Sequence, residues 1–86
     1  MDLQPAVATV VRNGEEVKLP IEEIIKGDLV LVRPGERIPV DGMVKHGSSY
    51  VDESMITGEP VPVARNRKDS VFSGSINQKG SLKVLA

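Results

Sequence analysis

The 86-residue sequence predicts a small, mostly β domain, and three observations support this class. Valine is the most frequent residue while aromatic residues make up only 2% of the chain, so the core must be aliphatic and suited to pleated sheets. Eight glycines and six prolines interrupt the apolar segments at short intervals. Only residues 20–28 have apolar side chains at helical spacing. We therefore expect a single domain over residues 1–86, with a core from about residue 6 to residue 85. Its predicted fold is a distorted jelly roll or antiparallel β-sandwich with one short helical segment.

The N-terminal part of the chain predicts a hairpin and then the helical segment. Strands over residues 6–12 and 15–19 flank Asn13-Gly14, a dipeptide that tolerates the positive φ angles of a tight reversal. Residues 20–28 begin with a proline and two nearby glutamates and reach Gly27 near their end. This order predicts one or two helical turns with the glycine as C-terminal cap.

The middle of the chain predicts three strands separated by turns. Residues 29–32 are apolar at every position, which is typical of a strand buried on both faces. The segment RPGERIPVDG is predicted to begin as a loop and to lead into a strand over residues 38–44, interrupted by an Asp41-Gly42 turn. Residues 45–49 are expected to form the next turn, and residues 49–52 a short strand.

The C-terminal third predicts one irregular strand and a second hairpin. Val61 and Val63 alternate with prolines, which cannot donate to a ladder of hydrogen bonds, so a strand there must be irregular or at an edge. Residues 71–76 and 81–85 are expected to form a hairpin around Lys79-Gly80.

Composition and charge exclude several functional classes. The net charge is −1, and the sequence has neither a basic stripe nor an aromatic stacking surface, which argues against nucleic-acid binding. The absence of cysteine excludes disulfides, thiolate zinc sites and iron–sulfur sites within this chain. No apolar segment approaches the roughly 20 residues that span a bilayer, and no signal-peptide pattern opens the chain. We expect the isolated domain to be a soluble monomer.

The segment DESMITGEP, residues 52–60, contains the candidate site. Its carboxylates at Asp52, Glu53 and Glu59 lack the spacing of an EF-hand, which disfavours a metal site. In Thr57-Gly58-Glu59-Pro60, the glycine permits a sharp turn, the threonine can hydrogen-bond locally and the proline stiffens the exit. Such a turn predicts that the Glu59 carboxylate is held outward on a rigid tip. That placement suits a group that orients water for a target on another domain.

This segment and GDLVLVRPGERIPVDG together resemble the actuator domain of P-type ATPases, specifically the heavy-metal-transporting (CPx-type) branch. The resemblance extends from about residue 6 to residue 85. The matching motifs, in chain order, are Gly27-Asp28, Pro34-Gly35-Glu36, Ile38-Pro39-Val40-Asp41-Gly42, Asp52-Glu53-Ser54, Thr57-Gly58-Glu59 and Gly74.

The resemblance implies a role for each residue of the segment. Glu59 would position and partly deprotonate the water that attacks an aspartyl phosphate on a separate phosphorylation domain. Thr57 and Gly58 would shape the loop and approach the phosphate. Structural support would come from hydrogen bonds made by the Asp52-Glu53-Ser54 segment, and from Pro60.

The resemblance also implies a larger membrane pump around this domain. The family's DKTGT phosphorylation motif, nucleotide-binding segments, membrane Cys-Pro-Cys and CxxC repeats are absent from this sequence. The domain alone is thus expected to bind no cofactor or metal and to show no ATPase activity, while ATP and Mg²⁺ act in the full pump. The implied partners are the phosphorylation and nucleotide-binding domains and the transmembrane helices of the same protein, at the cytoplasmic face of a membrane. Proline after TGE, with the RPGERIPVDG segment, resembles copper pumps more than zinc, cadmium or potassium relatives.

Two other functions stay open. A stand-alone carrier or adaptor domain could use Lys45 near a turn, although the sequence context of a carrier lysine is absent. An independent hydrolase could use Glu59, but no nucleophile or second catalytic partner is evident. Of the remaining charged residues, Glu36 and Arg37 either contact another domain or are solvated. The side chains expected to be solvated are Lys45, His46, Arg65, Arg67 and Lys68, although the segment ARNRKD could instead contact another domain or lipid headgroups.

Overall fold

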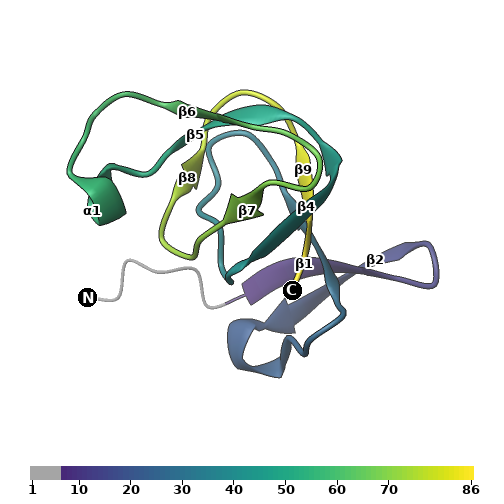
Figure 1. The fold of residues 1–86 in the computed structure, drawn as a ribbon. Coiled ribbons are helices and arrows are strands. Elements are labelled where there is room, and N and C mark those ends of the chain that lie inside the picture. The colour runs from purple at the N-terminus through teal and green to yellow at the C-terminus, as the bar shows by residue number, and fades with distance from the viewer. Residues whose placement is uncertain (1–6) are drawn as a thin grey trace.

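The computed structural model describes residues 7–86 as two antiparallel sheets (Figure 1). The two sheets share one aliphatic core. The larger sheet contains β1 (Val7–Arg12), β2 (Glu15–Pro20), β3 (Leu29–Val32), β4 (Gly42–Gly47), β7 (Ser70–Val71) and β9 (Leu82–Leu85), in the order β2-β1-β3-β9-β4-β7. The smaller sheet contains β5 (Ser49–Asp52), β6 (Val63–Arg65) and β8 (Ile76–Asn77), in the order β6-β5-β8. The two helical elements are the 3-10 helix η1 (Ile21–Glu23) and the α-helix α1 (Ser54–Thr57). The predicted mostly β, antiparallel class is confirmed.

A row of four valines crosses the centre of the larger sheet. Val10 lies opposite Val30, Val30 opposite Val84, and Val84 opposite Val44. All four side chains are 0% exposed. Because side chains two residues apart share a face of a strand, this row fixes which residues of β1, β3, β9 and β4 point into the core.

The predicted N-terminal hairpin is confirmed over the described residues. β1 pairs with β2 in register, and the turn residues Asn13 and Gly14 have φ angles of 54° and 77°, as a type I′ turn requires. Ala6, the first residue of the predicted strand, lies outside the described residues. The strand predicted over residues 49–52 is confirmed as β5. The edge strand predicted near Val63 is confirmed as β6, which lies at one edge of the smaller sheet.

The prediction of one or two helical turns within residues 20–28 is confirmed for one turn, η1, but the predicted cap is wrong. The chain leaves the helical conformation at Ile24, where ψ is 127°. The Asp28 carboxylate accepts a hydrogen bond from the Ile25 N–H (3.0 Å), which competes with continued helical hydrogen bonding. Gly27, with φ of 99°, therefore lies in the turn before β3 instead of capping a helix.

Two predictions for the middle strands are also wrong. β3 buries Val30 and Val32 but leaves Leu29 and Leu31 half-buried, so one face only is fully covered. β4 begins at Gly42, after an irregular stretch over residues 38–41, and extends to Gly47, within the predicted 45–49 turn. Its register shifts between Val44 and His46, a bulge that bends the strand so that Ser48 alone separates β4 from β5.

The predicted C-terminal hairpin does not form. Residues 71–76 divide between the sheets, since β7 pairs with β4 and β8 pairs with β5. The chain turns between them at Gly74 (φ 93°), where the Asp41 carboxylate accepts a hydrogen bond from the Ser73 N–H (2.8 Å). β9 then inserts between β3 and β4.

Arg12 ties the hairpin to the turn before β3. Its Nε and Nη2 donate to the two carboxylate oxygens of Asp28 at 3.2 and 2.8 Å. These hydrogen bonds, followed by the one from the Ile25 N–H, hold the pKa of Asp28 below its ordinary value.

Truncating the central valine should destabilise the 86-residue chain. Val84→Ala removes buried methyl groups and leaves a cavity, so we expect a loss of about 2–3 kcal/mol in the free energy of unfolding, measured in urea. Val61→Ala, at an exposed position, is the matched control and should change stability by no more than about 0.5 kcal/mol. Equal losses in the two variants would contradict the central role of the row.

The Asp28 hydrogen bonds should make stability depend on pH. The folded-state pKa lies below the ordinary value of 3.8, so in acid the unfolded chain takes up a proton before the folded chain does. The contribution is complete above that ordinary value and is lost as pH falls through the folded-state pKa. Asp28→Asn should thus be less stable than wild type at neutral pH, by a margin that shrinks in acid. A margin that stays constant in urea unfolding down to about pH 3 would be inconsistent with this shift.

Candidate functional site

The loop between β5 and β6 carries the predicted site and contains α1, a helix that the sequence reading missed. The Asp52 carboxylate accepts a hydrogen bond from the N–H of Ser54, the first residue of α1 (2.9 Å). The hydroxyl and the N–H of Ser54 together lower the pKa of Asp52. The side chain of an aspartate can accept a hydrogen bond from the backbone N–H two residues later, which favours such a turn at the start of a helix. Asp52 was therefore a local signal that could have revealed α1.

Thr57 connects the start of this helix to Glu59. Its N–H and its hydroxyl both donate to the Glu53 carbonyl oxygen, at 3.0 and 3.3 Å. The same hydroxyl accepts a hydrogen bond from the Glu59 N–H at 3.2 Å. The threonine side chain therefore holds the backbone of Glu59 against the first turn of α1.

Gly58 ends the helix in the left-handed conformation, with φ of 78° and ψ of 0°. Its N–H donates to the Ser54 carbonyl oxygen at 2.8 Å. A Cβ built at this glycine would meet nothing within 4 Å, so the backbone angle alone explains the residue. The chain then turns outward and leaves Glu59 and Pro60 exposed, where the sequence placed the tip.

A partly buried ion pair joins the first residue of the loop, Glu53, to the last residue of β6, Arg65. The Arg65 Nε and Nη2 donate to the two carboxylate oxygens of Glu53 at 3.0 and 2.9 Å. Glu53 is 5% exposed and the Arg65 side chain 23% exposed. The prediction that Arg65 is solvated is therefore wrong. Alternation along β5 and β6 is the reason, because Arg65 pairs with buried Ser49 and shares its face with Val51.

Apolar side chains surround the exposed tip. Met55, Ile56 and Val61 are all exposed, and they flank Glu59 along the loop. A groove of about 270 Å³ beside α1 is lined in part by Ile21, Pro39, Met55 and Ile56, with Arg37 at the same surface. The carboxylate of Glu59 thus belongs to a loop whose other exposed side chains are largely apolar.

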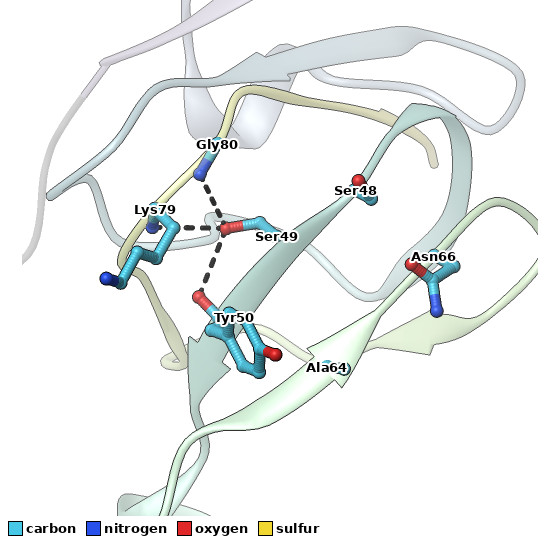
Figure 2. Close-up of a pocket in the computed structure, with 7 residues that line it drawn as sticks. All are labelled: Ser48, Ser49, Tyr50, Ala64, Asn66, Lys79 and Gly80. Carbon is cyan, nitrogen blue, oxygen red and sulfur yellow. Dashed lines mark hydrogen bonds between the residues drawn. The ribbon is translucent and has the colours of Figure 1, made fainter.

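A second depression, of about 440 Å³, lies at the other end of β5 (Figure 2). There Ser49 Oγ accepts hydrogen bonds from the N–H groups of Lys79 and Gly80, at 3.2 and 2.9 Å (Figure 2). Ser49 also hydrogen-bonds buried Asn77, whose amide donates to the Val32 carbonyl oxygen at 3.1 Å. These contacts connect β5 to both sheets and give the loop a fixed base.

The remaining predicted residues lie away from the tip. Lys45 and His46 are exposed on β4, and Arg67 and Lys68 are exposed in a turn after β6. Lys45 lies at the bulge inside a strand, a poor match to the hairpin tip of a carrier domain. Glu36 accepts a hydrogen bond from the Arg33 N–H (2.8 Å) within its own loop.

Two features are absent from residues 7–86. No three His, Asp or Glu side chains in this range come together as a group that could hold a metal ion. No helix in the same range is long and apolar enough to cross a membrane.

Comparison with known proteins gives the family. A family model described as the P-type ATPase actuator domain matches residues 2–86. The chain belongs to this family. The actuator domain is 57% identical over 98% of its length to a probable copper-exporting P-type ATPase of Archaeoglobus fulgidus, and 56% identical over its full length to the copper-exporting P-type ATPase of Bacillus subtilis. It spans only 10% and 11% of these two proteins.

A solved structure agrees with this assignment. The crystal structure of a zinc-transporting PIB-type ATPase in the E2.Pi state matches the actuator domain with a TM-score of 0.92 and 34% identity. The match covers 98% of this chain and 14% of that chain. The fold described above is therefore also found in the structure of this zinc-transporting ATPase.

The left-handed angle at Gly58 gives a test of the tip's conformation. Gly58→Ala should lower the free energy of unfolding by about 1–2 kcal/mol, because alanine is strained at this angle, although there is room for its methyl group. Gly58→Asn should lose less, since asparagine tolerates this region. Urea unfolding of the 86-residue chain provides the measurement. An alanine variant as stable as wild type would mean that the tip does not have this backbone conformation.

Proposed function

We propose that this actuator domain acts within a copper-transporting P-type ATPase, where Glu59 positions the water that hydrolyses an aspartyl phosphate on the phosphorylation domain. One observation carries the proposal: the Glu59 side chain is exposed, while the loop beneath it is fixed by Asp52, Thr57 and the Glu53–Arg65 pair. A carboxylate that projects from a rigid tip can be presented to a group on another domain.

The reaction itself requires little from this domain beyond one carboxylate. The water oxygen attacks phosphorus as the bond between phosphorus and the aspartate oxygen breaks, and Glu59 accepts a proton from the water. Phosphoryl transfer depends mainly on positioning and on stabilising charge. A well-placed general base contributes about 10²–10⁴-fold to the rate.

Thr57 and Gly58 are proposed to shape the loop so that it can approach the phosphate closely. In this structure the Thr57 hydroxyl is engaged within the loop, by Glu53 and by Glu59. This observation supports a loop-shaping role for the threonine. Gly58 leaves the backbone uncovered by a side chain, so the main chain can lie near a phosphate.

The partners follow from the proposed reaction. The actuator domain would act with the phosphorylation and nucleotide-binding domains of the same protein, which would bind ATP and Mg²⁺, and with its transmembrane helices. The domain would lie at the cytoplasmic face of the membrane. It would move as a rigid body that couples hydrolysis to the gating of transport.

Copper as the transported ion is supported by sequence identity. Two relatives named as copper exporters are 57% and 56% identical to this chain, whereas the zinc-transporting ATPase of Bacillus subtilis is 44% identical. The residues that choose the ion would lie outside this domain. The direct test of this part of the proposal is to measure which metal ion stimulates ATP hydrolysis by the full-length pump.

Removing the charge of Glu59 tests the catalytic role. In the full-length pump, Glu59→Gln should leave phosphorylation by ATP intact and slow the decay of the phosphoenzyme about 10²–10⁴-fold, because an amide cannot accept the proton. Decay is followed after a chase with unlabelled ATP. Glu15→Gln, at an exposed position in β2, is the matched control and should decay at the wild-type rate. Wild-type decay in Glu59→Gln would refute the proposed role.

A further inference from the structure

We infer that Arg65 is a positioning residue for this site and that it sets the rate of dephosphorylation through Glu53 and Thr57. The inference rests on the proposed function of Glu59. It extends that function to a residue outside the TGE motif whose side chain hydrogen-bonds Glu53. The evidence is a hydrogen-bonded path from Arg65 to the Glu53 side chain and then from the Glu53 backbone carbonyl through Thr57 to the backbone of Glu59.

The first step is the ion pair itself. Two guanidinium nitrogens of Arg65, Nε and Nη2, donate hydrogen bonds, and each contacts a different carboxylate oxygen of Glu53. Two parallel charge-assisted hydrogen bonds fix the orientation of both groups as well as their distance. Because Glu53 is almost fully buried, water competes weakly for its carboxylate.

The second step passes through the backbone of Glu53. Its carbonyl oxygen accepts hydrogen bonds from the Ile56 N–H (2.9 Å), the Thr57 N–H (3.0 Å) and the Thr57 hydroxyl (3.3 Å). A helix of four residues has little stability of its own. The anchored Glu53 therefore determines where α1 begins and how its last residue is oriented.

The third step reaches the tip. The Thr57 hydroxyl accepts the hydrogen bond from the Glu59 N–H at 3.2 Å. Arg65 thus fixes Glu53, Glu53 fixes Thr57, and Thr57 fixes Glu59. The charge of Arg65 is balanced by Glu53, so its effect on the reaction is geometric. A displacement of about 1 Å at a reacting group can reduce a rate about 10²-fold.

The test measures phosphoenzyme decay in the full-length pump with changes at Arg65. Arg65→Met removes the guanidinium and both of its hydrogen bonds to Glu53, and it should slow decay by about tenfold or more without changing the level of phosphorylation by ATP. Arg65→Lys keeps the charge but cannot form the two-point contact, so its decay rate should lie between those of Arg65→Met and wild type. Thr57→Val breaks the next link and should also slow decay. If Arg65→Met folds poorly, Arg65→Lys and Thr57→Val still test the same series of contacts.

The chain offers a matched control for the ion pair. Arg12 forms the same two-point contact with Asp28, but at the turn before β3. Arg12→Met should destabilise the domain without changing the decay of the phosphoenzyme. If Arg12→Met slows decay as much as Arg65→Met, general destabilisation explains both and the inference fails.

A double variant separates positioning of Glu59 from other effects. If Arg65 acts through Glu59, adding Arg65→Met to Glu59→Gln should slow decay no further. Independent effects would multiply, and that result would overturn the inference. The series also distinguishes the two proposals. Wild-type decay in Glu59→Gln refutes the proposed function, whereas slow decay in Glu59→Gln with wild-type decay in Arg65→Met refutes only the role of Arg65.

Discussion

The contact among Val10, Val30, Val84 and Val44 is the constraint on which the rest of the structure depends. These side chains meet across four strands that are far apart in sequence, and the last strand, β9, lies between β3 and β4. The larger sheet is therefore incomplete until the C-terminal residues are in place. Once the row has formed, the period of two in each strand determines the direction of every other side chain. The valine row also fixes the position of the bulge in β4, after which Ser48 connects β4 to β5.

Polar contacts in the interior also stabilise the fold, in addition to the packing of the valines. Ser49 and Asn77 hold the base of β5, while Glu53 and Arg65 hold the loop at its far end. Each of these side chains is buried or half-buried and has hydrogen-bond partners, as a thin aliphatic core requires. The smaller sheet is thus held by these directional contacts in addition to the apolar packing of Val51 in the shared core.

Local chemistry made part of this structure predictable. Asn13-Gly14 indicates its hairpin without help from distant residues, and Thr57-Gly58-Glu59 indicates an exposed turn in the same way. The errors arose where distant residues decide the conformation. β9 pairs with strands that lie 35 or more residues earlier in the chain, as the pairing of Gly47 with Leu82 shows, and the bulge at Lys45 depends on that pairing. The sequence alone predicts that Arg65 is a surface residue. Its contact with Glu53 depends on the pairing of β5 with β6.

The ion pair between Glu53 and Arg65 also determines when the loop loses its freedom. Ordering a residue costs roughly 1–2 kcal/mol of backbone entropy, so a free loop of this length would lose much of its affinity each time it met its target. Here the folded domain has already ordered the loop before any encounter. The entropic penalty then falls once, on folding, and does not recur with each cycle of the pump.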